Sequence, residues 1–207
     1  MRSPREHPTS RFVTLAVAVV LGLTGCGGGA DSAADTRPTT GSSASPAGPA
    51  GSSPADGDGR LTGEGYSFEL PPGWRDATEE FQEYSELIDV GAVNAEQAGE
   101  AFSDNINVLR NADQVALPPA QAEHQFAEEL RTVAERVEVR RAATVDGVEA
   151  LHLTGLTVAR EVTAVTDQYI AYVDGAYFVV TFSFATDTPP VQRQEEIAAM
   201  LDSWTWG

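Results

Sequence analysis

Lysine is absent from this 207-residue chain, and cysteine occurs once, at position 26. All 13 basic residues are therefore arginine, and the 31 acidic residues leave a formal charge of -18. A protein that binds nucleic acid needs a basic face to neutralise phosphates, so we expect no nucleic-acid partner. The lone cysteine excludes an internal disulfide framework, a CxxC redox pair and a zinc site built from several cysteines.

The sequence also has few candidates for catalysis. It lacks the GxSxG, HExxH, P-loop and GxGxxG motifs. Two pairs of consecutive glutamates, Glu128-Glu129 and Glu195-Glu196, lie on predicted helices. Consecutive side chains on a helix diverge, so neither pair can act as the two carboxylates of a glycosidase. His124 and His152 are the only candidate metal ligands of the histidine type in 60–207. The alternative for His124 is a solvated position on a helix, and the alternative for His152 is a half-buried position on a strand. We expect no metal, no cofactor and no enzymatic activity.

The first 25 residues have the organisation of a secretory signal. Arg2, Arg5 and Arg11 precede an apolar run from Phe12 to Gly25, and small residues end the run. The run has 14 residues, fewer than the roughly 20 that cross a bilayer as a helix. A permanent transmembrane helix is therefore the weaker of two interpretations.

The residues Leu23, Thr24, Gly25 and Cys26 resemble the lipobox of bacterial lipoproteins. The resemblance implies cleavage after Gly25, a diacylglycerol thioether on Cys26 and an acyl chain such as palmitate on the freed amine. The alternative is an ordinary signal peptide whose cleavage site contains a cysteine. Because two or more acyl chains anchor a protein stably, we expect the mature protein on the outer face of the cytoplasmic membrane.

Residues 26–59 are predicted to be a disordered, lipid-anchored tether. Between 27 and 59 there is no Val, Ile, Leu, Met, Phe, Tyr or Trp, so the segment has too little to bury to offset the entropy of ordering. A flexible chain of this length spans on the order of 30 Å. The globular domain then covers 60–207, where 9 arginines and 26 acidic residues leave a charge of -17.

The hydrophobic pattern of 60–207 predicts an α+β fold. Two Asp-Gly pairs, at 146–147 and 174–175, are suited to type I′ hairpin turns. Apolar residues occupy both faces of 176–185, so we expect helices to cover the sheet on both sides. The predicted strands are 66–70, 88–93, 106–109, 137–145, 148–158, 163–173 and 176–185, and the predicted helices are 118–134 and 189–204.

Two segments carry a family resemblance. Gly65–Trp74 resembles the opening of PsbP-like domains, where an aromatic strand runs into Pro-x-Gly-Trp, and Asp104–Val108 is similar to their Asn-Ile-x-Val strand. LpqN-like actinobacterial lipoproteins also resemble this chain. The resemblance implies an αβα sandwich with a mostly antiparallel sheet, which serves as a binding or scaffolding module and has no shared catalytic residues.

Two functional hypotheses follow. The first is a surface-tethered lipoprotein whose domain binds a protein partner of the envelope, and the second is a carrier with an apolar cavity for a lipid or small molecule. Trp74 and Trp206 are the candidate contact residues. We expect Trp74 mainly to pack against the end of the sheet, whereas Trp206, next to the C-terminal residue, is a candidate exposed contact.

Overall fold

The computed structural model describes residues 59–159 and 162–207. Among these residues, no helix has the length and apolar character needed to span a bilayer. The elements, in chain order, are β1 (Arg60–Gly63), β2 (Tyr66–Glu69), β3 (Trp74–Asp76), α1 (Thr78–Gln82), β4 (Ile88–Asn94), a 3-10 turn (Ala95–Gln97), β5 (Asn105–Asn111), α2 (Pro119–Arg131), β6 (Ala134–Val139), β7 (Ala143–Val145), β8 (Val148–Ala159), β9 (Val162–Val173), β10 (Ala176–Ala185), α3 (Pro190–Asp202) and β11 (Thr205–Trp206).

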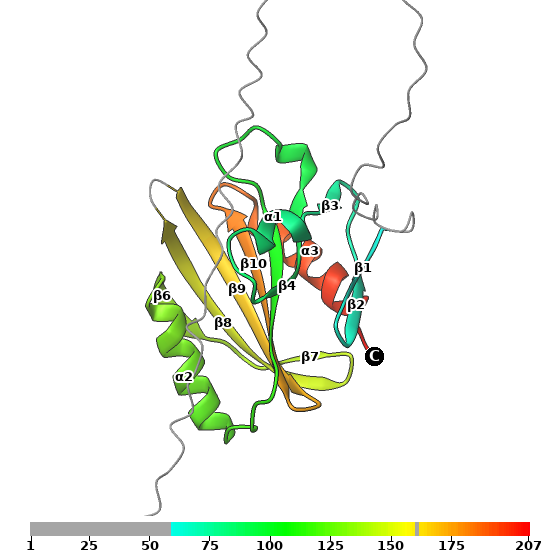
Figure 1. Cartoon of the computed structure of the whole chain (residues 1–207). Coiled ribbons are helices and arrows are strands. Elements are labelled where there is room, and N and C mark those ends of the chain that lie inside the picture. The colour runs from blue at the N-terminus through cyan, green and yellow to red at the C-terminus, as the bar shows by residue number, and fades with distance from the viewer. Residues whose placement is uncertain (1–58, 160–161) are drawn as a thin grey trace, which may run out of the picture.

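The core of the molecule is an eight-stranded antiparallel sheet (Figure 1). Its strand order is β3-β4-β5-β10-β9-β8-β6, and β7 pairs with β8. Both predicted hairpins are confirmed, since Asp146 and Asp174 have φ of 44° and 47° and each is followed by a glycine with positive φ. Positive φ at both central residues is the requirement of a type I′ turn. Tyr172 pairs with Tyr177, as the two-residue loop predicts.

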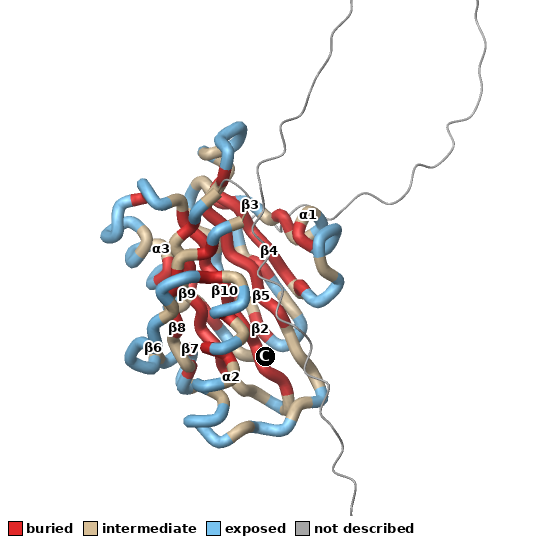
Figure 2. Tube along the Cα trace, turned by 90° about the vertical axis from the view of Figure 1, so that its left-hand side faces the viewer, coloured by how far each residue is buried: buried red, intermediate tan, exposed pale blue. Residues whose placement is uncertain are grey.

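Helices cover both faces of this sheet, which confirms the predicted α+β sandwich (Figure 1). On β10, Phe178 and Phe182 point toward α3, whereas Tyr177 and Val179 point toward α1 and α2. This alternation gives each face of the sheet its own apolar cluster. Figure 2 shows the result, with buried central strands and exposed residues at the turns and on the outer sides of the helices.

Three predicted boundaries are wrong in detail. The segment 137–145, predicted as one strand, is divided between β6 and β7. Val139 pairs with Leu153 and Ala143 pairs with Ala150, so an advance of four residues on this segment lies opposite an advance of three residues on β8. The extra residue interrupts the ladder, as in a β-bulge. The predicted helix 118–134 ends at Arg131, since β6 begins three residues later, and the predicted helix 189–204 ends at Asp202.

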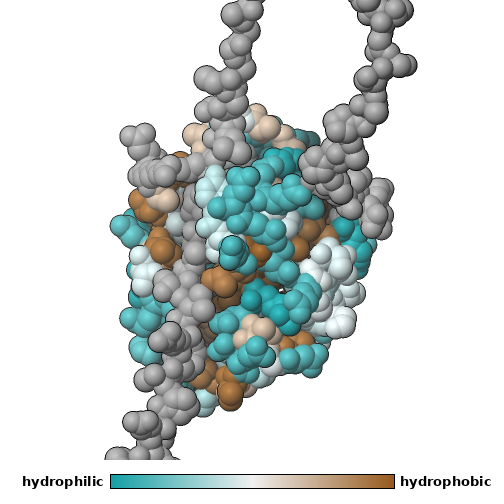
Figure 3. Space-filling model, viewed as in Figure 1, coloured by the Kyte–Doolittle hydropathy of each residue, from teal (hydrophilic) through white to brown (hydrophobic). Residues whose placement is uncertain are grey.

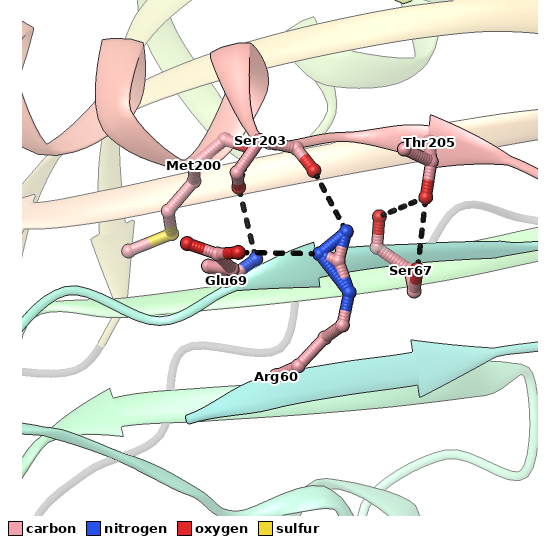
Figure 4. A network of polar contacts seen from close by, with 6 residues as sticks. All are labelled: Arg60, Ser67, Glu69, Met200, Ser203 and Thr205. Atoms are coloured by element: carbon pink, nitrogen blue, oxygen red, sulfur yellow. Dashed lines mark hydrogen bonds and ion pairs between the residues drawn. The ribbon is translucent and has the colours of Figure 1, made fainter. Parts of the chain in front are cut away.

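The ends of the domain form a second sheet that the sequence pattern does not predict. Its order is β1-β2-β11, so the last strand pairs with one of the first. Figure 4 shows the polar contacts of this closure. The Arg60 guanidinium donates to the Ser203 carbonyl at 3.3 Å, the Glu69 amide donates to the Ser203 hydroxyl at 2.9 Å, and the Ser67 and Thr205 hydroxyls lie 2.9 Å apart. The C-terminal segment is thereby fixed to the start of the domain.

Candidate functional site

The predicted anchor lies outside the described residues. Leu23, Thr24, Gly25 and Cys26 precede Gly59, the first residue that the structure describes, and so do the signal peptide and nearly all of the tether. Lipid attachment at Cys26 stays a prediction from the sequence. The candidate site that the structure can describe is therefore within the globular domain.

The two candidate contact tryptophans both lie in the apolar cluster on the α3 side of the sheet. Trp74 is only 9% exposed, as expected for a packing residue. Trp206 is half-buried rather than exposed, because its indole N–H donates to the Val145 carbonyl at 2.9 Å and its ring lies 5.1 Å from that of Phe178. Contact of Trp74 or Trp206 with a partner is not tested by where these residues lie in the structure, and it stays a prediction.

An aromatic stack explains why the C-terminus packs so closely. The Trp204 ring stacks on both Tyr66 and Phe68, with centroid distances of 4.7 and 4.9 Å and interplanar angles of 4° and 2°. Burial raises the pKa of the Tyr66 hydroxyl, and the nearby Asp89 carboxylate raises it further. Tyr66 therefore stays neutral at physiological pH. This cluster stabilises the fold and presents no reactive group.

The two histidines of the domain occupy the positions that the sequence suggests. His124 is exposed on α2. His152 is half-buried on β8, where its Nε2 lies 2.9 Å from Asp167 Oδ1 and its ring stacks on Tyr169 at 4.3 Å. The described residues contain no group of three or more His, Cys, Asp or Glu side chains placed to hold a metal ion.

The most unusual feature of the domain is a grid of buried polar side chains on the face of the sheet that α1 and α2 cover. Three neighbouring strands each contribute two residues at positions i and i+2, and all six side chains belong to residues that are 0–1% exposed. The cross-strand register places them in two rows. We call this grid the polar patch; its residues are Asn105 and Asn107 on β5, Thr181 and Ser183 on β10, and Thr166 and Gln168 on β9.

The register fixes the shape of the polar patch. Asn105 pairs with Ser183, which pairs with Thr166; in the next row, Asn107 pairs with Thr181, which pairs with Gln168. Side chains directly opposite in neighbouring strands lie about 5 Å apart, and successive side chains on one face of a strand lie about 7 Å apart. The patch is therefore about 10 Å across the strands and 7 Å along them. Beyond the Asn107 row the face becomes apolar.

Hydrogen bonds within the patch satisfy only part of it. Asn105 Nδ2 donates to the Ser103 carbonyl at 3.0 Å, Gln168 Nε2 donates to the Thr181 hydroxyl at 3.2 Å, and the Thr166 hydroxyl lies 2.7 Å from that of Thr157. Five buried atoms of the patch have no partner among the described residues. They are Asn105 Oδ1, both amide atoms of Asn107, Gln168 Oε1 and Ser183 Oγ.

Such unpaired atoms are rare, since most buried polar side-chain atoms in proteins have a partner. An unsatisfied buried group costs about 1–3 kcal/mol. By contrast, the neighbouring buried carboxylate of Asp104 is fully engaged: it accepts from the Ala185 amide at 2.7 Å, the Thr188 hydroxyl at 3.0 Å and Gln97 Nε2 at 3.0 Å. Asp104 is a structural residue, whereas the polar patch has five buried atoms without a partner among the described residues.

Helices border the polar patch on both sides. On one flank α1 packs on β4, and on the other α2 packs on β6 and β8. The ring of Phe81 lies directly on Gly91, where an added Cβ would sit only 2.4 Å from a ring carbon. Because Gly91 pairs with Asn107, this flank of the patch is aromatic. Figure 3 shows the same side of the molecule, on which hydrophilic and apolar residues are interspersed.

Comparison with known proteins identifies the fold. No protein-family model matches the chain, and no curated protein matches it. Among solved structures, LpqN of Mycobacterium tuberculosis, involved in cell envelope biogenesis, has a TM-score of 0.52 at 19% identity, and the match covers 74% of this chain and 88% of LpqN. Cyanobacterial PsbP (CyanoP) of Synechocystis sp. PCC 6803 has a TM-score of 0.50 at 17% identity and covers 77% of this chain and 100% of its own. The fold is PsbP-like.

The polar patch of this PsbP-like domain was not predicted, although the sequence contains a signal for it. The signal is three polar pairs at i and i+2, namely Asn105/Asn107, Thr166/Gln168 and Thr181/Ser183. Apolar residues alternate with the pairs on β5 and β10, whereas Asp167 separates Thr166 from Gln168. That pattern normally indicates a face in contact with water. Here the sheet is covered on both sides, so the same pattern places polar groups in the interior.

Proposed function

We propose that this protein is a lipid-anchored, non-enzymatic module of the cell envelope that binds a protein partner on the outer face of the cytoplasmic membrane. The lipobox ending at Cys26 supports the anchor. The tether of 26–59, poor in apolar residues, would hold the domain clear of the lipid headgroups. The likeness of the fold to LpqN, an envelope protein, is consistent with this location.

The chemistry of the polar patch favours a binding role for the domain over a catalytic one. Its side chains are amides and hydroxyls, which do not titrate near neutral pH. General acid–base catalysis needs a titratable group within hydrogen-bond reach of the substrate. A grid of neutral donors and acceptors therefore gives no support to proton transfer.

The apolar carrier is the second candidate function, and the packing of the domain favours partner binding over it. A carrier needs an apolar cavity between sheet and helix. The space between the sheet and α3 holds Phe182, Phe184 and Met200, each of which is 0% exposed. These side chains occupy the volume that an apolar ligand would need on that side.

The charge of the domain also bears on the choice of partner. Its -17 formal charge opposes contact with anionic headgroups. The same charge speeds the association of a protein that presents a basic surface, since electrostatic complementarity acts mainly on the rate of encounter. We therefore expect the envelope partner to be basic around its contact surface.

The composition of the chain dictates the experiment. With no lysine side chains, the protein does not react through side-chain amines, but a carbodiimide couples its many carboxylates to the lysines of a partner. The intact lipoprotein is crosslinked in native membranes and compared with Cys26→Ala. We expect a coupled envelope protein with the wild type and its loss when Cys26→Ala leaves the membrane. Recovery of a co-purifying lipid and no coupled protein from the wild type would establish the carrier instead.

A further inference from the structure

The connection between β5 and α2 exposes a run of apolar residues. Positions 115–120 read Val-Ala-Leu-Pro-Pro-Ala, and no side chain among them is polar. Val115 is 84% exposed, more than any other large apolar residue that the structure describes, and only Leu117 of the run is half-buried. We call residues 115–120 the apolar loop. Single apolar residues are common on protein surfaces, whereas a continuous exposed run indicates a contact site.

Hydrogen bonds to the β9–β10 hairpin hold the apolar loop in one shape. The Gln114 amide donates to the Gly175 carbonyl at 2.9 Å, and the Tyr172 hydroxyl donates to the Gln114 carbonyl at 2.9 Å. The Leu117 amide donates to the Tyr177 hydroxyl at 2.7 Å. On the loop side all three bonds use main-chain groups, so they do not require apolar side chains at 115 and 116.

Two prolines stiffen the end of the apolar loop. Pro118 has φ of -53° and ψ of 139°, close to the polyproline II conformation, and Pro119 opens α2. Neither residue has a main-chain N–H, so this stretch offers a partner mainly apolar contact. A loop that is already fixed loses little conformational entropy when it binds, which favours affinity.

The surroundings of the apolar loop are acidic. Asp113 precedes it, Asp174 lies in the hairpin turn to which it is bonded, and Glu123 follows Ala120 by three residues on the exposed side of α2. None of these three carboxylates forms an ion pair with another described residue, and no arginine occurs from 111 to 130. A complementary surface is therefore apolar at its centre and basic around it.

The apolar loop lies at the end of the domain far from Gly59, where the predicted tether joins (Figure 1). Figure 3, in the same view, shows apolar residues in brown at this lower end of the molecule. A partner that docks here leaves β1 and the entry of the tether uncovered.

We propose that the apolar loop is the docking site for the partner protein, which receives Val115 in an apolar pocket bordered by arginine or lysine side chains. The inference rests on the proposed function, in which an envelope protein binds the domain. A second copy of this chain does not fit, because its domain carries a formal charge of -17 and would be repelled. The same carboxylates oppose contact with an anionic lipid surface.

The test places the photo-crosslinking residue p-benzoylphenylalanine at position 115 of the full-length protein in its native envelope. The matched control is position 191, because Val191 is also exposed, at 65%, but lies on α3. We expect position 115 to crosslink to one envelope protein, within a segment that contains arginine or lysine, and position 191 not to do so. The yield from position 115 should fall as NaCl is raised, since salt screens exposed charges.

Carbodiimide coupling of the same partner gives a second measurement. Val115→Arg removes the apolar contact and brings a like charge to a basic surface, so coupling should fall by about tenfold or more. Val191→Arg should couple as the wild type does. Both side chains are exposed, so neither substitution disturbs the core.

The proposal would be overturned by equal coupling of Val115→Arg and the wild type, or by equal crosslinking from positions 115 and 191. Crosslinking from position 115 to lipid, or to a second copy of the chain, would also overturn it. If carbodiimide couples an envelope protein that position 115 does not reach, the docking site is wrong and the proposed function stands. If no envelope protein is coupled at all, both fail.

Discussion

Replacing Asn107 by leucine should stabilise the free protein. Asn107 is 0% exposed, and neither of its amide atoms has a partner among the described residues. The wild type therefore carries the cost of an unsatisfied buried group, about 1–3 kcal/mol. Leucine has a similar size and removes both unpaired atoms. We expect the free energy of unfolding to rise by about 1–2 kcal/mol, and Tm by about 3–6 °C for a domain of this size.

The assay is urea unfolding followed by tryptophan fluorescence, because Trp74 and Trp204 report on the buried cluster. An unchanged m-value with a higher midpoint shows a true gain in stability. The control is Thr181→Val, which removes the hydroxyl that accepts from Gln168 Nε2 and should lower stability by about 1 kcal/mol. If Asn107→Leu lowered the free energy of unfolding by more than about 1 kcal/mol, its amide would be hydrogen-bonded in solution, and the reasoning about unpaired atoms would fail.

Three further predictions concern the core, the anchor and pH. Trp204→Ala should lower the free energy of unfolding by about 3–5 kcal/mol, since the ring is 2% exposed and stacked on two others, and unfolding curves measure this directly. Radiolabelled palmitate should label the wild type but not Cys26→Ala, and equal labelling of both would disprove the anchor. Burial raises the pKa of Glu196, and the charges of Asp104 and Glu96 raise it further, although a hydrogen bond from Gln192 opposes them. The stability that Glu196 contributes is thus present at pH values below 4.5 and declines as the pH rises through its folded pKa. Glu196→Gln should therefore raise Tm at pH 7 and leave it unchanged at pH 3, whereas a lower Tm at pH 7 would contradict the assignment.

Local patterns in the sequence predicted the central sheet well. The turn at 174–175 and the register of β9 with β10 follow from a dipeptide that accepts positive φ and from the two-residue length of the loop. The apolar spacing of 118–134 likewise predicts Phe126, Leu130 and Val133 as the apolar face of a helix. Phe126 and Leu130 are buried on α2, whereas Val133 lies beyond the end of the helix and is half-buried. These features depend on residues that are close together in the chain, so their pattern is visible in a short window.

Features that depend on distant residues were not predicted. The β1-β2-β11 sheet joins segments separated by 138 positions, and β11 has only two residues, too few to show a period. The polar patch depends on the register of three strands at once. Its residues can be recognised as buried only after both faces of the sheet are known to be covered. Side-chain burial at such positions is a property of the tertiary structure.

The most direct test of the proposed function combines the anchor with the partner. Full-length wild type and Cys26→Ala are expressed in their native envelope and coupled to neighbouring proteins with carbodiimide. We expect one envelope protein coupled to the wild type and lost from Cys26→Ala. Recovery of no coupled protein from the wild type would contradict the central claim that the domain binds a protein of the envelope.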